Sequence, residues 1–255
     1  MTRMILTLCL ICSTAFLQAC ATVDGKGDPN DPLEGFNRAM YSFNDGVDRY
    51  VLKPVARGYD AVTPAPVQKG VSNFFSNLDD VVVIVNDLLQ FKFKRAARDT
   101  GRFLVNSTLG LFGLIDWASD MGLEKNNEDF GQTLGYWGVP EGPYVVLPFL
   151  GPSTLRDTGG LYVDTAYLDP VYNELHEDWP PPSRENTDAV WGMTILKTID
   201  TRAKLLKAEK IMDQAALDPY IFLREAYLQR RKNLVYDGNP PVEEPIFNES
   251  ELFDE

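Results

Sequence analysis

The first twenty residues most constrain this chain, because they have the pattern of an export signal and not of a folded segment. Arg3 is followed by a charge-free run from Met4 to Leu17 and then by small residues. A basic start, an apolar stretch and a small-residue processing site are the three parts of a secretory signal. The apolar stretch is shorter than the roughly 20 residues needed to span a bilayer. We therefore expect residues 1–19 to be a signal peptide that is removed.

The processing site ends in a cysteine. Leu17-Gln18-Ala19-Cys20 resembles the lipobox of bacterial lipoproteins, in which the thiol is acylated and becomes the mature N-terminus. The resemblance implies lipidation of Cys20, and Ala21 after it fits sorting to the outer membrane. Acyl chains add about 0.8 kcal/mol of membrane affinity per buried methylene. We expect the small, polar residues 20–30 to form a lipidated tether. The alternative is an ordinary signal peptide that happens to contain Cys20.

Cysteine usage and charge exclude several classes of site. Cys9 and Cys12 leave with the signal and Cys20 is used for acylation, so we expect no disulfide and no cysteine-based zinc site. The formal net charge of the chain is -13, and residues 237–255 hold seven acidic and no basic residues. Such a segment is predicted to be a disordered acidic tail. The overall acidity argues against nucleic acid as a partner, because backbone binding needs a basic face.

Between the tether and the tail, residues 31–236 are predicted to form one mostly helical domain, with apolar residues recurring at helical spacing. A first helix should start with Asp31 as cap and Glu34 completing a capping box, and should end before Pro54. Further helices are predicted over residues 67–89, 188–214 and 218–234. We expect the basic residues of the last one to be exposed: Arg224, Arg230, Arg231 and Lys232.

The predicted helix over residues 67–89 has a wide apolar face and a narrow polar one. If the apolar face meets lipid, the polar face would line a wet lumen, since polar groups are tolerated at membrane depth only there. Asn73, Asn77 and Asp80 are the candidates for this channel lining. Exposure to solvent on an ordinary soluble helix is an equally good interpretation of the same pattern.

A basic cluster then precedes a charge-free segment. Arg95, Arg98 and Arg102 share one helical face and are candidates to face lipid headgroups. Residues 103–115 carry no charge and are predicted to be either a buried core helix or one that enters the membrane interface. In the second case the candidate lipid contacts are Leu111, Phe112, Leu114 and Ile115.

Two further features of the sequence concern packing. Asn106, Gly110 and Gly113 fall on one stripe, which predicts a close approach of a neighbouring backbone. Residues 131–160 are rich in glycine and proline yet strongly apolar, which predicts a long irregular loop. That loop either packs under other elements or faces lipid, and in the latter case Tyr144, Leu147 and Phe149 are candidate lipid contacts.

No motif marks a catalytic centre. His176 is the one histidine, and its acidic, proline-flanked context favours a surface position. The chain has no G-x-S-x-G elbow, no H-E-x-x-H motif and no P-loop. We therefore expect no enzymatic activity, no cofactor and no metal. A hydrolase that uses paired carboxylates stays as a rival hypothesis.

Three stretches together identify a family resemblance. They are D-P-L-E-G-F-N-R-A-M-Y-S-F-N (31–44), G-P-Y-V-V-L-P-F-L-G-P-S-T-L-R-D (142–157) and D-P-Y-I-F-L-R-E-A-Y-L-Q-R (218–230). With the lipobox, this ordered set resembles the MlaA (VacJ) outer-membrane lipoproteins. The resemblance implies an all-α, ring-like domain in the outer membrane around an amphipathic channel, with residues 131–152 as the apolar loop near it.

The resemblance also implies a function and partners. The expected function is removal of mislocalised phospholipid from the outer leaflet of the outer membrane, with delivery to a periplasmic carrier resembling MlaC, which maintains lipid asymmetry. The expected location is the periplasmic face of the outer membrane of a Gram-negative bacterium, beside a trimeric porin. The rival within this frame is a structural adaptor that binds porins without transporting lipid.

Overall fold

The computed structural model describes residues 31–171, 184–215 and 217–241. The predicted signal, Cys20 and the tether lie outside the described residues, and so do His176 and residues 242–255 of the predicted tail. Asp237, the first residue assigned to that tail, is described and forms ion pairs with Lys92 and Arg95 at 2.7 and 2.5 Å. The ordered chain therefore continues past residue 236.

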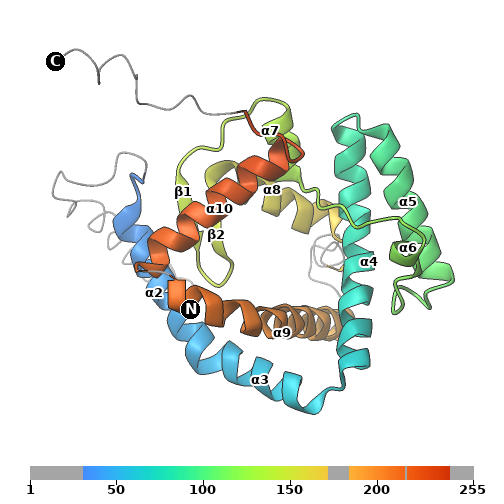
Figure 1. The fold of residues 1–255 in the computed structure, drawn as a ribbon, viewed down its shortest axis with the longest axis horizontal. Helices are drawn as coiled ribbons and strands as arrows, with labels where there is room; N and C mark the ends of the chain where they lie inside the picture. The colour runs from blue at the N-terminus through green and yellow to red at the C-terminus, as the bar shows by residue number, and fades with distance from the viewer. Residues whose placement is uncertain (1–30, 172–183, 216, 242–255) are drawn as a thin grey trace.

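The described residues form an all-α domain, as predicted, together with one small hairpin that the sequence did not predict. In chain order the elements are α2 (Glu34–Val47), η2 (Asp48–Leu52), α3 (Lys53–Val62), α4 (Ala65–Leu89), α5 (Phe93–Thr108), α6 (Trp117–Asp120), α7 (Phe130–Tyr136), β1 (Tyr144–Leu147), β2 (Gly151–Thr154), α8 (Leu155–Val163), η3 (Asp164–Leu168), α9 (Arg184–Ala215) and α10 (Pro219–Val235). Figure 1 shows α4, α9, α10 and the α7–α8 region as the sides of a ring, with α5 and α6 outside α4.

The first helix does not stop before Pro54, as the sequence predicted. A π-helical segment, η2, joins α2 to α3, and the Lys53 N–H bonds to the carbonyl of Asp48, five residues back. Pro54 lies in the first turn of α3, directly after this π turn. The wider π turn accommodates the proline, so the chain stays helical from Glu34 to Val62.

Asp31 does not cap this helix either. It is fully buried and accepts hydrogen bonds from Asn37 at 3.0 Å and Arg224 at 3.2 Å, and also from the Tyr220 hydroxyl. Asp31 therefore anchors α10 to α2. Asp218 does cap α10 as predicted, accepting from the N–H of Tyr220 at 2.9 Å. Arg224 and Arg231, predicted to be exposed, are only 8% exposed because each binds buried carboxylates.

The predicted irregular loop over residues 131–160 is largely ordered. It contains α7, an antiparallel hairpin and the start of α8, with Tyr144 opposite Thr154 and Leu147 opposite Gly151. Proline is tolerated because Pro152 lies on β2 of an isolated two-stranded ribbon, whose outer edge needs no partner. Two asparagines of α2 bind the hairpin backbone. Asn37 contacts Tyr144 and Val146, and Asn44 contacts Leu147 and Phe149, all at 2.8–3.0 Å.

The polarity of the interior is the reverse of that of a soluble domain. Among the described residues, 20 buried side chains are polar or charged and only 12 are hydrophobic. Large apolar side chains are exposed along most helices; on α4 the fully buried residues include Asn77, Asp80, Asn86 and Asp87. Soluble proteins rarely bury charged side chains or expose large apolar patches. An exterior of this kind suits contact with an apolar medium.

Candidate functional site

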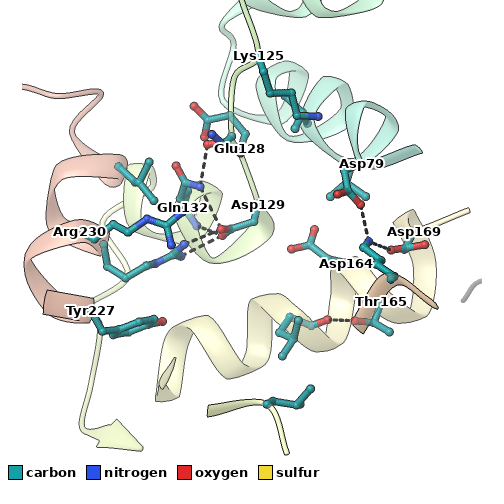
Figure 2. A pocket seen from close by; sticks show the side chains of 18 of the residues that line it. Asp79, Lys125, Glu128, Asp129, Gln132, Asp164, Thr165, Asp169, Tyr227 and Arg230 are labelled. Atoms are coloured by element: carbon teal, nitrogen blue, oxygen red, sulfur yellow. Dashed lines mark hydrogen bonds and ion pairs between the residues drawn. The ribbon is translucent and has the colours of Figure 1, made fainter. Parts of the chain in front are cut away.

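A cavity of about 670 Å³ lies within the ring of helices. Its wall combines apolar and charged side chains from six separate parts of the chain, one of which is the hairpin turn with Leu150 (Figure 2). α4 and α9 contribute one side, and the segment before α7, the η3 region and α10 contribute the others. The apolar lining residues are Val82, Val83, Leu150, Leu161 and Leu234. A space lined in this way accommodates a molecule with both an apolar and an ionic part.

Most charges of the cavity wall are held in ion pairs between helices. Lys197 of α9 binds Asp79 of α4 at 2.6 Å. Arg231 of α10 binds Asp129 at 2.6 and 3.0 Å. It also binds Asp157 of α8 at 2.8 Å. Although burial raises the pKa of Asp129, the hydrogen bonds and charge of Arg231 outweigh it and lower that pKa. These pairs fix the helices around the cavity.

Asp164, at the start of η3, is an exception in this wall. It is 8% exposed, and its oxygens accept from Asn86 at 3.1 Å and from the Phe130 N–H at 2.9 Å. No basic side chain forms an ion pair with it among the described residues. Burial raises its pKa to about 6, despite the hydrogen bonds that lower it. Among the described residues Asp164 therefore has no cation in direct contact, and the charge of Arg231 acts on it only from a longer distance.

A second feature is an exposed apolar loop outside α4. The predicted helix over residues 103–115 is only half correct, because α5 ends at Thr108 and turns follow. Leu111, Phe112 and Gly113 all have positive φ, of 53°, 59° and 89°. This loop exposes the four apolar side chains predicted to contact lipid: Leu111 at 60%, Phe112 at 79%, Leu114 at 46% and Ile115 at 42%.

Polar side chains support this loop from beneath. Asn73 donates to the Leu114 carbonyl at 3.1 Å, and Asn77 donates to Ser107 at 2.9 Å. Gly113 packs directly on Asn77, where a Cβ would lie 2.6 Å from that side chain. Gly113 therefore has a close neighbour, but that neighbour is the side chain of Asn77 and not the backbone that the sequence predicted, and the segment is a turn and not a helix.

Arg102 is the centre of the same support. It donates to Asp116 at 2.8 Å and to the Leu123 carbonyl at 2.7 Å, and it lies 3.4 Å from Asp80. Asp80 is also bound by Lys125. Burial raises the pKa of Asp116, but hydrogen bonds from Ser119, Arg102 and Asn106 lower it to about 2. The loop is thus held by paired charges.

These contacts correct several candidate residues. Asn77 and Asp80 do not line the cavity, because they lie on the side of α4 that faces α5 and the loop. Asp79, the residue before Asp80, lines the cavity instead. Asn73 also binds the loop. Arg102 is 3% exposed and binds protein carboxylates, so it faces no headgroup in this structure.

The other candidates divide by exposure. Arg98 is exposed, while Arg95 is half-buried against Glu128 and Asp237. Tyr144 is 2% exposed and packs with Val146 and Tyr220 in the apolar cluster under the hairpin, so it is not a lipid contact. Leu147 is half-buried, and Phe149 at the hairpin tip is 70% exposed. Lipid contact by the exposed members stays a prediction.

The cavity residues Asp164, Lys197 and Arg230 were not predicted from the sequence. Each lies in a different element, and nothing in their spacing links them. The one available signal was the acidic Asp164 directly after the apolar residues Leu161–Val163. Within the part of the chain that the structure describes, no helix is both long and apolar enough to cross a membrane.

Comparison with known proteins agrees with the sequence resemblance. Residues 29–234 match the family described as MlaA lipoprotein. The chain is 41% identical over 243 residues to the intermembrane phospholipid transport system lipoprotein MlaA of Escherichia coli K12, covering 92% of this chain and 91% of the relative. The Haemophilus influenzae protein of the same name is 37% identical over 244 residues, covering 93% and 92%.

A solved structure from work on the structural basis for maintenance of bacterial outer membrane lipid asymmetry has the same fold. It is 40% identical, with a TM-score of 0.67, and the match covers 80% of this chain and 98% of that one. Sequence and fold therefore agree over nearly the whole described domain. The chain belongs to the MlaA lipoprotein family.

Proposed function

We propose that this protein is an outer-membrane lipoprotein, anchored through Cys20, that removes mislocalised phospholipid from the outer leaflet and passes it to a periplasmic carrier. The observation that carries this proposal is the cavity of about 670 Å³ with apolar and ionic walls, inside a domain whose exterior is apolar. The names of the relatives, which place them in an intermembrane phospholipid transport system, support it.

The wall chemistry fits a lipid path that works without bond chemistry. Val82 and Val83 offer contacts to glycerol and acyl groups, while Arg230 brings positive charge to the same space. A phosphate is bound well by such groups, and acyl chains by the aliphatic ones. Transfer then needs shape and polarity only, so the protein acts as a conduit and not as an enzyme.

The exposed loop and hairpin tip supply the contact with the membrane. Phe112 and Phe149 are exposed by 79% and 70% and lie on rigidly supported turns. Apolar side chains with this exposure gain free energy on entering the acyl region, at about 25 cal/mol per Å² buried. A trimeric porin beside the ring is the neighbour that family membership suggests.

Blocking the cavity tests the proposal. Thr194 lines the cavity, whereas Thr198, one turn later on α9, does not. Both hydroxyls bond to the carbonyl four residues earlier, each at 2.8 Å, so the two positions are matched locally. Outer-leaflet phospholipid is measured in cells lacking the protein and complemented with wild type, Thr194→Trp or Thr198→Trp, with membrane localisation checked for each.

We expect wild type and Thr198→Trp to clear surface phospholipid, and Thr194→Trp to leave it raised. If Thr194→Trp clears lipid as well as wild type does, the cavity is not the path and the adaptor hypothesis becomes the better one. If wild type itself leaves surface lipid unchanged, transfer is wrong for this protein.

A further inference from the structure

The cavity wall leaves two charged groups without a protein partner. Arg230 lines the cavity and forms no ion pair or hydrogen bond with the rest of the described chain, although Arg231 beside it is bound by two carboxylates. Asp164 has hydrogen bonds to Asn86 and to the Phe130 N–H but no counter-ion within the same described residues. One free positive and one free negative group thus face a single space.

Two hydrogen-bonding atoms of the same wall are also unmet. The Oε1 atom of Gln132, a residue only 2% exposed, accepts no hydrogen bond in the described structure. The Nε atom of Arg231 donates none to any described residue. Buried polar atoms are rarely left without partners, and each such exception needs an explanation. Both atoms are buried behind the surface of the wall, so the groups that a ligand in the cavity can reach directly are Asp164 and Arg230.

The remaining charges of the wall are already occupied. Asp79 is bound by Lys197 at 2.6 Å, and Glu128 is bound by Lys92 at 3.0 Å and Arg95 at 3.2 Å. A ligand gains little by displacing these pairs, since separating a buried pair strands both charges. The unmet groups therefore decide what the cavity prefers.

We propose that the cavity prefers phospholipids whose headgroup carries a primary ammonium beside its phosphate, and disfavours net-anionic ones. This inference rests on the proposed function. The phosphate is held by Arg230, and the ammonium donates to Asp164. A glycerol headgroup leaves the Asp164 carboxylate without a counter-ion. A trimethylated ammonium has no N–H to donate to it.

The test measures which lipids the full-length, acylated protein carries. Protein purified in detergent is equilibrated with an equimolar mixture of phosphatidylethanolamine, phosphatidylglycerol and phosphatidylcholine that share the same acyl chains. The lipids retained on the protein are then quantified by mass spectrometry. Only phosphatidylethanolamine can donate a charge-assisted hydrogen bond to Asp164. We therefore expect it to be enriched about threefold to tenfold over each competitor.

Variants separate the two charges. Asp164→Asn keeps the shape and removes the negative charge, so the enrichment should fall to about one while the total lipid bound stays similar. Arg230→Gln, at an exposed position, should lower the binding of all three lipids, because each has a phosphate. Arg98→Gln is the matched control, since Arg98 is exposed but lies on α5, away from the cavity.

Arg230→Glu provides an independent test that does not depend on folding of a buried variant. Added negative charge should raise the ratio of phosphatidylethanolamine to phosphatidylglycerol above that of wild type. Wild type that retains the three lipids in the proportions of the mixture overturns the preference and leaves the proposed function intact. A ratio unchanged in Arg230→Glu also overturns the preference. Wild type that retains no phospholipid at all contradicts the proposed function itself.

Discussion

Two polar regions flank α4, and they differ in whether their charged side chains form ion pairs. The loop base lies between α4 and α5 and supports the apolar loop; it consists of Asn73, Asn77, Asp80, Arg102, Asn106 and Asp116. The cavity wall lies on the other side of α4. In the loop base each charge has an opposite partner within 4 Å, whereas the cavity wall leaves Asp164 and Arg230 unpaired within the described chain.

Two aspartates show what this difference means. Asp116 and Asp164 are both partly or fully buried, which raises the pKa of each. In Asp116 the hydrogen bonds from Ser119, Arg102 and Asn106 outweigh burial, and the pKa falls to about 2. Asp164 has only two neutral donors, and its pKa rises to about 6. Paired charges in this protein hold its structure, and the unpaired ones are available to a ligand.

The largest expected effect comes from breaking the loop base. Arg102→Ala leaves Asp116 without its cation and removes the ion pair between α5 and the loop. Removing one member of a buried ion pair costs about 3–5 kcal/mol, so we expect a loss of that order in the free energy of unfolding. Urea titration of the full-length protein in detergent, followed by circular dichroism, measures it.

Arg98→Ala is the control for this change. Arg98 lies on the same helix but is exposed, and its one described contact is 3.5 Å from the Glu124 carbonyl. We expect a change of about 0.5 kcal/mol or less, as for surface substitutions generally. Equal effects of the two substitutions would contradict the view that the loop base is the structural region.

A smaller loss is expected from crowding the loop base. Gly113 has φ of 89°, and a Cβ there would meet Asn77 at 2.6 Å. Gly122 has a similar φ of 80° but open space around it. Gly122→Ala should therefore cost about 1–2 kcal/mol for the left-handed backbone alone. Gly113→Ala should cost that and a further ~1–3 kcal/mol for overpacking.

Thermal unfolding of the two variants, measured side by side, separates the cost of the left-handed backbone from the cost of overpacking against Asn77. The same samples can be tested for binding to phospholipid vesicles, where Gly113→Ala should bind less because it displaces Phe112 and Leu114. If Gly122→Ala is as damaging as Gly113→Ala, packing on Asn77 contributes nothing beyond backbone strain.

The sequence predicted those parts of the fold that depend on local patterns and missed those that depend on contacts between distant residues. Helical spacing predicted α4, α9 and α10 well, and the Asp218 cap of α10 was correct, because these are local patterns. The hairpin was missed because its backbone is held by Asn37 and Asn44, more than a hundred residues earlier in the chain.

The candidate site was less predictable, because direction on a helix decides it. Asn77 and Asp80 were rightly identified as the polar face of α4, but that face meets α5, while Asp79 meets the cavity. Adjacent helical residues point about 100° apart. Which of them meets the cavity depends on how α5 and α9 pack against α4, and the sequence of α4 alone does not encode that packing.

A third prediction concerns pH and a carboxyl pair behind the cavity wall. Burial, together with a hydrogen bond shared with Asp99, raises the pKa of Asp87 to about 7. An unfolded aspartate titrates near 3.9. Between these values the folded protein holds a proton that the unfolded chain has lost, so stability falls as the pH rises from about 4 to 7. Asp116, with its lowered pKa, loses its stabilising effect only below this window.

We therefore expect the melting temperature to be higher at pH 5.5 than at pH 8.0, by about 4–8 °C. Asp87→Asn removes the group with the highest pKa and should reduce this slope, leaving the part due to Asp164, whose pKa is about 6. Asp120→Asn, at an exposed site, should leave the slope unchanged. A wild-type melting temperature that falls on acidification through this range would show that Asp87 is ionised throughout and that the pair does not share a proton.

The smallest effect on the free energy of unfolding is expected for Asp164→Asn, the substitution of the unpaired carboxylate in the cavity wall. Asp164→Asn removes a buried charge that has no counter-ion, so the gain from avoiding its desolvation offsets the loss of one hydrogen bond, about 1 kcal/mol. Asparagine can still accept from the Phe130 N–H, and Asn86 can turn its amide so that its oxygen faces the new side chain. The free energy of unfolding at pH 7.5 should change by about 1 kcal/mol or less.

The same urea titration measures the free energy of unfolding of Asp164→Asn beside that of Arg102→Ala. A loss as large as that of Arg102→Ala would mean that Asp164 is paired in solution and belongs to the structure. A near-neutral change leaves its charge free for the ligand.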